Sequence, residues 1–175
     1  MRRLRYQVAC SLDGYIAGPA GEFDWIPEEP TFDFDALYSQ FDTLLMGRLT
    51  YEAVRDFRDM FRDKRVVVLS RTLRQEEHPE VEIVASDAEA RVRALKEEPG
   101  KDIWLYGGGE LFRAMLRARL VDTVEPAVLP ILLGGGVPFL PAPADRVALE
   151  LRSHTVYPAG MVLLEYDVHD ARSSQ

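Results

Sequence analysis

Residues 103–111 read Ile103-Trp104-Leu105-Tyr106-Gly107-Gly108-Gly109-Glu110-Leu111, a short apolar run that ends in three consecutive glycines. The run has the length of a buried strand, and Leu111, Met115 and Ala118 then follow at helical spacing. Glycine lets the backbone approach a ligand closely, and the N-terminus of the following helix offers free N–H groups to a diphosphate. A tight strand-to-helix turn without a ligand explains the same glycines, so this stretch alone leaves both interpretations open.

Two more junctions of this kind come earlier in the chain. Gly47-Arg48-Leu49-Thr50 follows the apolar run 43–46, and Ser70-Arg71-Thr72 follows the apolar run 66–69. Parallel strands bring their carboxyl ends to one edge of an open sheet, which is where ligands bind. Each junction alone fits a structural turn, but three junctions, two of them with arginine, favour an anionic cofactor.

Short apolar runs alternate with helical patterns over the first two thirds of the chain. We predict buried strands at residues 8–10, 43–46, 66–69, 81–84 and 103–106. One helical face is formed by Phe34, Leu37, Tyr38 and Phe41, and a less regular one by Tyr51, Val54, Phe57 and Phe61. Ser86-Asp87-Ala88-Glu89 has the pattern of a capping box that begins another helix, which Pro99-Gly100 ends.

The last third of the chain has a different pattern. Residues 121–132 are apolar and fit either a dimer surface or a central strand. Residues 147–156 and 161–168 flank the turn sequence Tyr157-Pro158-Ala159-Gly160, which predicts an antiparallel hairpin. The predicted fold class is α/β, with a mostly parallel central sheet, this hairpin at one edge, and helices on both faces. We expect one domain over residues 1–169 and a polar tail over residues 170–175.

Composition excludes several classes of protein. The 175 residues include 21 Lys and Arg against 29 Asp and Glu, a formal net charge of −8 that disfavours a general nucleic-acid or membrane binder. No apolar run approaches the roughly 20 residues of a membrane span. Cys10 is the only cysteine, which indicates a reducing cytoplasm, and His78, His154 and His169 lack the spacing of metal ligands. We expect no metal.

The connection between the first strand and the first helix is long. It contains Gly14, Gly18, Pro19, Gly21, Pro27 and Pro30. Loops of this length in compact domains are often functional lids, although a plain surface loop fits as well. In the second case Trp25 and Ile26 would be core anchors.

At this point several motifs match a known family. Ser11-Leu12-Asp13-Gly14-Tyr15-Ile16-Ala17, Trp25, the stretch 45–52, Leu69-Ser70-Arg71 and the stretch 107–111 resemble dihydrofolate reductase. The stretch Pro130-Ile131-Leu132-Leu133-Gly134-Gly135-Gly136-Val137-Pro138-Phe139 is similar to the C-terminal reductase domain of bifunctional riboflavin-biosynthesis enzymes. The resemblance covers about residues 5–168. It implies a three-layer dihydrofolate reductase-like fold and an NADPH-dependent reductase of a small heterocyclic (pterin- or pyrimidine-like) or carbonyl substrate.

The resemblance also implies roles for particular residues. The phosphates of NADPH would lie on the two glycine-containing helix starts, the adenosine 2′-phosphate beside the Ser-Arg pair, and the nicotinamide under the loop after the first strand. The implied cofactor-binding residues are Ala9, Ile16, Ala17, Gly47, Arg48, Leu49, Thr50, Leu69, Ser70, Arg71, Tyr106, Gly107, Gly108, Gly109, Glu110 and Leu111. Trp25 and Phe34 would contact substrate, and domains of this branch often form homodimers. Glu110 departs from the family, which often places a basic residue there.

Reduction of a C=N bond requires a proton as well as a hydride. The resemblance places the proton donor at the start of the helix after the Trp-containing loop, where Asp33 is the better match and Asp35 the second. An Asp at that position is also the usual N-cap of a helix. The alternative to a reductase is a non-catalytic nucleotide-binding sensor or scaffold that retains the cofactor pocket.

Overall fold

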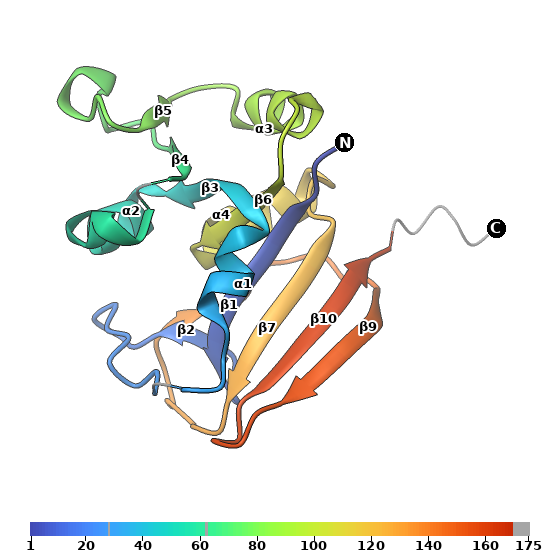
Figure 1. The fold of residues 1–175 in the computed structure, drawn as a ribbon. Helices are drawn as coiled ribbons and strands as arrows, with labels where there is room; N and C mark the ends of the chain where they lie inside the picture. Colours follow the sequence, from blue (N-terminus) through green and yellow to red (C-terminus); the bar gives the residue numbers. More distant parts are fainter. Residues whose placement is uncertain (28, 62, 170–175) are drawn as a thin grey trace.

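The computed structural model describes residues 1–27, 29–61 and 63–169, and its centre is an eight-stranded sheet (Figure 1). The strand order is β5 (Glu82–Val84), β4 (Arg65–Leu69), β3 (Phe41–Gly47), β6 (Asp102–Gly107), β1 (Leu4–Ser11), β7 (Thr123–Leu129), β10 (Val162–Val168), β9 (Leu149–Val156). The six strands from β5 to β7 are parallel, and β10 is antiparallel to both β7 and β9. The mostly parallel sheet and its C-terminal antiparallel hairpin are thus confirmed. The polar tail expected at 170–175 lies outside the described residues.

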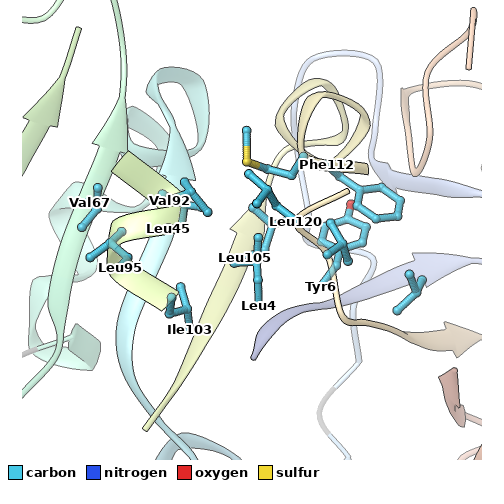
Figure 2. Packing of buried hydrophobic residues seen from close by; sticks show 13 residues of the cluster. Leu4, Tyr6, Leu45, Val67, Val92, Leu95, Ile103, Leu105, Phe112 and Leu120 are labelled. Carbon is cyan, nitrogen blue, oxygen red and sulfur yellow. The ribbon is translucent and has the colours of Figure 1, made fainter. Parts of the chain in front are cut away.

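Helices cover both faces of the sheet, because side chains alternate along each buried strand. On one face, α3 (Ala88–Glu97) and α4 (Gly109–Arg117) pack on a cluster that includes Leu45 (Figure 2). The Tyr6 and Phe112 rings stack there with centroids 3.8 Å apart. On the other face, α1 (Phe34–Ser39) and α2 (Arg48–Val54) pack on a cluster that includes Leu44.

Three local predictions about the helices were wrong. Phe41 begins β3 and is fully buried, since α1 is only six residues long and ends at Ser39. The second helical face divides into α2 and the 3-10 helix η1 (Arg55–Phe61), with non-helical dihedral angles at Phe57. The capping box is not formed within the described chain: Asp87, in a left-handed conformation with φ 53°, is the N-cap of α3 and makes no capping hydrogen bond through its side chain.

Residues 123–129 of the apolar segment 121–132 form an inner strand. β7 lies between β1 and β10 and is hydrogen-bonded to both, so its apolar side chains serve the core of this chain. That arrangement matches the central-strand interpretation for residues 123–129, whereas Leu132, beyond the strand, is exposed. The described helices include none long and apolar enough to cross a membrane.

The connection between β1 and α1 contains β2 (Tyr15–Ala17), which pairs with the short strand β8 (Val137–Pro138). A second connecting element, the 3-10 helix η2 (Gln75–Glu77), lies between β4 and β5. β2 and β8 form a separate two-stranded sheet, which holds the β1–α1 connection against the segment that follows β7.

Candidate functional site

The structure brings the three strand ends side by side, but only β3 and β6 lead into α-helices. The expected junction after β4 is instead a turn at residues 70–73, followed by η2. β4, β3 and β6 are neighbours, with Gly47 opposite Leu69 and Met46 opposite Gly107 in the parallel register. The junctions therefore share the carboxyl edge of the sheet, where α2 and α4 begin (Figure 1). Their helix N-termini direct unpaired backbone N–H groups and a positive dipole end to this edge.

The glycine turn after β6 is tightly packed at Gly109 and conformationally restricted at Gly107. Gly107 has φ +131°, a conformation that L side chains rarely adopt. A Cβ on Gly108 would lie 3.5 Å from Thr50 Oγ1, so the turn meets the start of α2. A Cβ on Gly109 would lie 2.4 Å from the Pro138 carbonyl oxygen. Glycine at position 109 thus allows the turn to approach the backbone at Pro138 closely. A bound diphosphate would need the same close approach to the backbone.

The charged residues of the edge differ in how they are paired. The Arg48 guanidinium forms an ion pair with Glu52 at 2.9 Å, one turn along α2. Arg71 is exposed and has no hydrogen-bond or ion-pair partner among the described residues. The Glu110 carboxylate pairs with Arg113 on the next turn of α4, which neutralises the charge that would repel a phosphate.

Ser70 is buried beside Arg71, at the end of β4. Its hydroxyl oxygen accepts hydrogen bonds from the backbone N–H groups of Thr72 (3.2 Å) and Leu73 (3.0 Å). Leu69, the last residue of β4, is half-buried, whereas Leu49 is largely exposed at the start of α2. Leu111, in the first turn of α4, packs against the core.

The remaining residues assigned to the cofactor lie beside the glycine turn or on β1 and β2. Ala9 is half-buried on β1, opposite Ala127, and Ile16 and Ala17 are half-buried on β2. Tyr106, the residue before the glycines, is largely buried, and burial raises its pKa, so the hydroxyl stays protonated. The Cys10 thiol is also buried, which raises its pKa to about 11 and leaves it unreactive at neutral pH.

The two candidate proton donors lie at the start of α1. Asp33 is exposed and is the N-cap, since its Oδ1 accepts a hydrogen bond from the Ala36 backbone N–H at 2.8 Å. Asp35 is exposed in the first turn. The structural role that the sequence left open for Asp33 is therefore present, and it occupies one of the two carboxylate oxygens.

The two aromatic residues expected to contact substrate are placed differently. Phe34 is 56% exposed on α1, and its ring meets that of Phe32 edge-on at 4.7 Å. Trp25 is half-buried, and it packs beside Phe32 on a small cluster under the β9–β10 hairpin. The Trp25 Nε1–H donates to the Glu22 carbonyl at 3.2 Å. Both residues belong to the segment on the α1 side of the sheet.

A cavity of about 210 Å³ lies beside α2, which the sequence did not indicate. Apolar side chains including Met46, Val54 and Phe61 line it, together with Tyr51. The Tyr51 hydroxyl donates to Glu80 Oε1 at 2.8 Å and lies 3.1 Å from His78 Nδ1. His78 thus ties the connection before β5 to α2. A metal-binding group of three or more His, Cys, Asp or Glu side chains is not found within residues 1–27, 29–61 and 63–169.

Substitution of Gly109 tests the close approach at the glycine turn. Gly109→Ala would force the Pro138 carbonyl away, and overpacking of this kind lowers the free energy of unfolding by about 1–3 kcal/mol. Gly135→Ala is the matched control, because a Cβ there meets no atom within 4 Å. Urea denaturation measures both variants. Equal stability of the two variants would show that the turn tolerates a side chain.

The chain is similar in sequence and in fold to several known proteins. The model of the RibD C-terminal domain family matches residues 2–163. The uncharacterized protein YyaP of Bacillus subtilis is 30% identical over 178 residues, covering 94% of each chain. A crystal structure from Shewanella sp. PV-4, provisionally named a riboflavin biosynthesis protein, is 29% identical with a TM-score of 0.83, covering 96% of this chain and 99% of that one.

A more distant structure shares the fold. Dihydrofolate reductase from Enterococcus faecalis is 19% identical with a TM-score of 0.71, covering 96% of this chain and 97% of that one. The layered sheet described above is therefore a dihydrofolate reductase-like fold. With a family match over residues 2–163, the chain belongs to the RibD C-terminal domain family.

Proposed function

We propose that the protein is an NADPH-dependent reductase that transfers hydride to a small heterocyclic acceptor, pterin- or pyrimidine-like, or to a carbonyl compound. The observation that carries the proposal is the meeting of three junctions at one sheet edge, with the unpaired cation of Arg71 beside them. Membership of the RibD C-terminal domain family supports it. The dihydrofolate reductase from Enterococcus faecalis, which shares the fold, was crystallised with NADP(H).

The residues at the edge fit an anionic dinucleotide. The turn at Gly107–Gly109 and the start of α2 at Gly47–Thr50 would bind the diphosphate through backbone N–H groups, which the space beside Gly47, Gly107 and Gly108 supports. Ser70 and Arg71 would hold the adenosine 2′-phosphate, for which a guanidinium fork is suited. NADPH, when bound, supplies the hydride, and the chain's own residues orient it and exclude water.

The acceptor side would be formed by α1 and the connection before it. Trp25 and Phe34 offer apolar surface to a flat ring. Asp33 would hold or relay the proton through Oδ2, since only Oδ1 is used in capping α1. Asp35 is the second candidate for this role.

Cofactor binding is the first test of the proposal. Because the 2′-phosphate is the group that distinguishes NADPH from NADH, Arg71→Ala should weaken NADPH binding about tenfold or more and leave NADH within about twofold. Arg117→Ala, another exposed arginine at the end of α4, should change neither. Titration followed by tryptophan fluorescence gives both dissociation constants. An equal loss for both cofactors would refute the 2′-phosphate role of Arg71.

Turnover distinguishes the reductase from a nucleotide-binding sensor. Asp33→Asn preserves a good N-cap while removing the ionisable group. It should lower kcat about 100-fold or more with the stability of the chain nearly unchanged, because general-acid catalysis contributes about 10²–10⁴-fold. Asp35→Asn tests the second candidate, and the variant with the larger loss of kcat identifies the proton donor. NADPH oxidation with pterin, pyrimidine and quinonoid acceptors is measured by absorbance; NADPH binding without any oxidation would favour the sensor.

A homodimer is part of the proposal, and the edge strand β9 is the surface that supports it. Every residue of β9 is exposed, and its outer edge is unpaired in the described chain. Leu149, Leu151 and Val156 add apolar surface there, and unprotected edges of this kind pair with other chains. The free buried thiol of Cys10 fits a reducing compartment, and we propose the cytoplasm.

Sedimentation tests the dimer. The wild-type chain should sediment at about twice its 19.8 kDa mass, and Leu151→Lys should shift it to the single-chain mass because a charge at a buried interface is costly. Phe57→Lys, at a similarly exposed apolar residue of η1, should stay dimeric. A single-chain mass for the wild type would exclude the dimer.

A further inference from the structure

The carboxylate of Asp13 joins two segments that are 120 residues apart in the chain. Its Oδ2 accepts a hydrogen bond from the Gly134 backbone N–H at 2.7 Å, and its Oδ1 accepts one from Leu133 at 3.0 Å. The hydroxyl of Ser11 donates to Oδ1 at 2.6 Å, and Ser11 Oγ accepts from the Tyr15 backbone N–H at 2.9 Å. Three donors therefore converge on one carboxylate, at the point where β1 ends.

Backbone contacts extend this junction. The Leu12 N–H donates to the Ile131 carbonyl at 2.9 Å, and the Phe139 N–H donates to the Gly14 carbonyl at 2.8 Å. A Cβ on Gly136 would lie 2.1 Å from the Ala17 carbonyl oxygen. Segments 12–17 and 131–139 thus form one packed unit, with Asp13 as the charged residue that fastens it.

This unit touches the proposed diphosphate turn. Pro138, in the second segment, supplies the carbonyl oxygen against which Gly109 packs at the start of α4. Ile16 and Ala17, in the first segment, are residues proposed to cover the nicotinamide. The unit would therefore lie beside the bound cofactor at two places. Pro138 would support the turn that holds the diphosphate, and Ile16 and Ala17 would cover the nicotinamide.

The end of the β1–α1 connection nearer to α1 is held by a different carboxylate, that of Glu29. Glu29 is buried, and its Oε2 accepts a hydrogen bond from the Ala159 backbone N–H, in the β9–β10 turn, at 3.1 Å. Its Oε1 accepts from the Thr31 N–H and hydroxyl. Loss of the Asp13 contacts would therefore loosen the end near the cofactor, which the backbone contacts of Leu12 and Gly14 would still hold in part, and leave the other end unchanged.

We infer that Asp13 is a positioning residue for NADPH: it fixes segment 12–17 over the nicotinamide through its bonds to Leu133 and Gly134, and so slows release of the cofactor. The inference rests on the proposed function. Asp13 itself is not assigned a contact with the cofactor or the acceptor. It acts through the backbone that it holds.

The ionised form of Asp13 is the form that makes these contacts. The Ser11 hydroxyl and the backbone N–H groups of Leu133 and Gly134 hold the pKa of Asp13 below its usual range, because they favour the carboxylate. A lowered pKa means that the contacts stabilise the fold at neutral pH and are lost as the pH falls through that lowered value. The carboxylate contacts no ionisable side chain within the described residues.

The test is Asp13→Asn, which keeps the size of the side chain and replaces one acceptor oxygen with a donor that opposes a backbone N–H. Stopped-flow displacement of NADPH should show release about tenfold faster than in the wild type, as expected for loss of a hydrogen bond to a charged group. In amide ¹⁵N–¹H spectra of the free protein, the Gly134 resonance should move, and its titration at acid pH should disappear.

Two controls separate positioning from general loosening. Asp24→Asn removes an exposed carboxylate of the same connection that takes part in neither anchor, and should change neither NADPH release nor the Gly134 resonance. Glu29→Gln weakens the far anchor; it should shift the Ala159 resonance and leave NADPH release within about twofold. An Asp13→Asn variant that releases NADPH at the wild-type rate, or a Glu29→Gln variant that releases it equally fast, would overturn the inference.

Failure of the proposed function is distinguishable from failure of the inference. A wild-type protein that binds no NADPH overturns both, while the Gly134 resonance still shows whether the Asp13 contacts form. A wild-type protein that binds NADPH, with unchanged release in Asp13→Asn, overturns the inference alone.

Discussion

Close backbone approach at the carboxyl edge of β4, β3 and β6 is the constraint on which the rest of the structure depends. Three parallel strands that are neighbours must end at the same edge, so their turns compete for the same space. The turn after β6 meets Thr50 on one side and the Pro138 carbonyl on the other. Gly109 has no room for a Cβ, and Gly107 has a φ that L side chains rarely adopt, so the turn depends on glycine at these two positions.

The pairing of charged residues at this edge leaves one cation available to an anionic ligand, although the chain as a whole is acidic. Two of the relevant charged residues are already paired along their own helices, Arg48 with Glu52 and Glu110 with Arg113. The second pair shows why a carboxylate beside the glycines is compatible with a phosphate. Arg71 has no such partner in the described chain. Its guanidinium could therefore pair with a bound anion without first breaking an ion pair.

Local sequence patterns predicted elements well where packing and local preference agree. The strands at 43–46, 66–69 and 103–106 lie within β3, β4 and β6, because short β-branched or apolar runs bury both faces of a parallel sheet. The patterns failed at helix ends. Phe41 continues the helical spacing of α1, yet burial against Trp104 with ring centroids 5.0 Å apart places it in β3. Spacing alone carries no information on that contact.

The sequence by itself determined the succession along the chain of the α-helices and of the strands of the main sheet, the C-terminal hairpin and the residues at each strand end, because these follow from periodicity and turn chemistry. The short strands β2 and β8 were not predicted. The structure confirms the N-cap interpretation of Asp33 and pairs Arg113 with Glu110, both contacts between residues three positions apart. Only the tertiary structure decided that Asp13 accepts hydrogen bonds from Leu133 and Gly134. The Asp13 contacts join residues about 120 positions apart, and no local rule relates such residues. They meet because β1 and β7 are neighbours in the sheet and deliver the segments that follow them to the same edge.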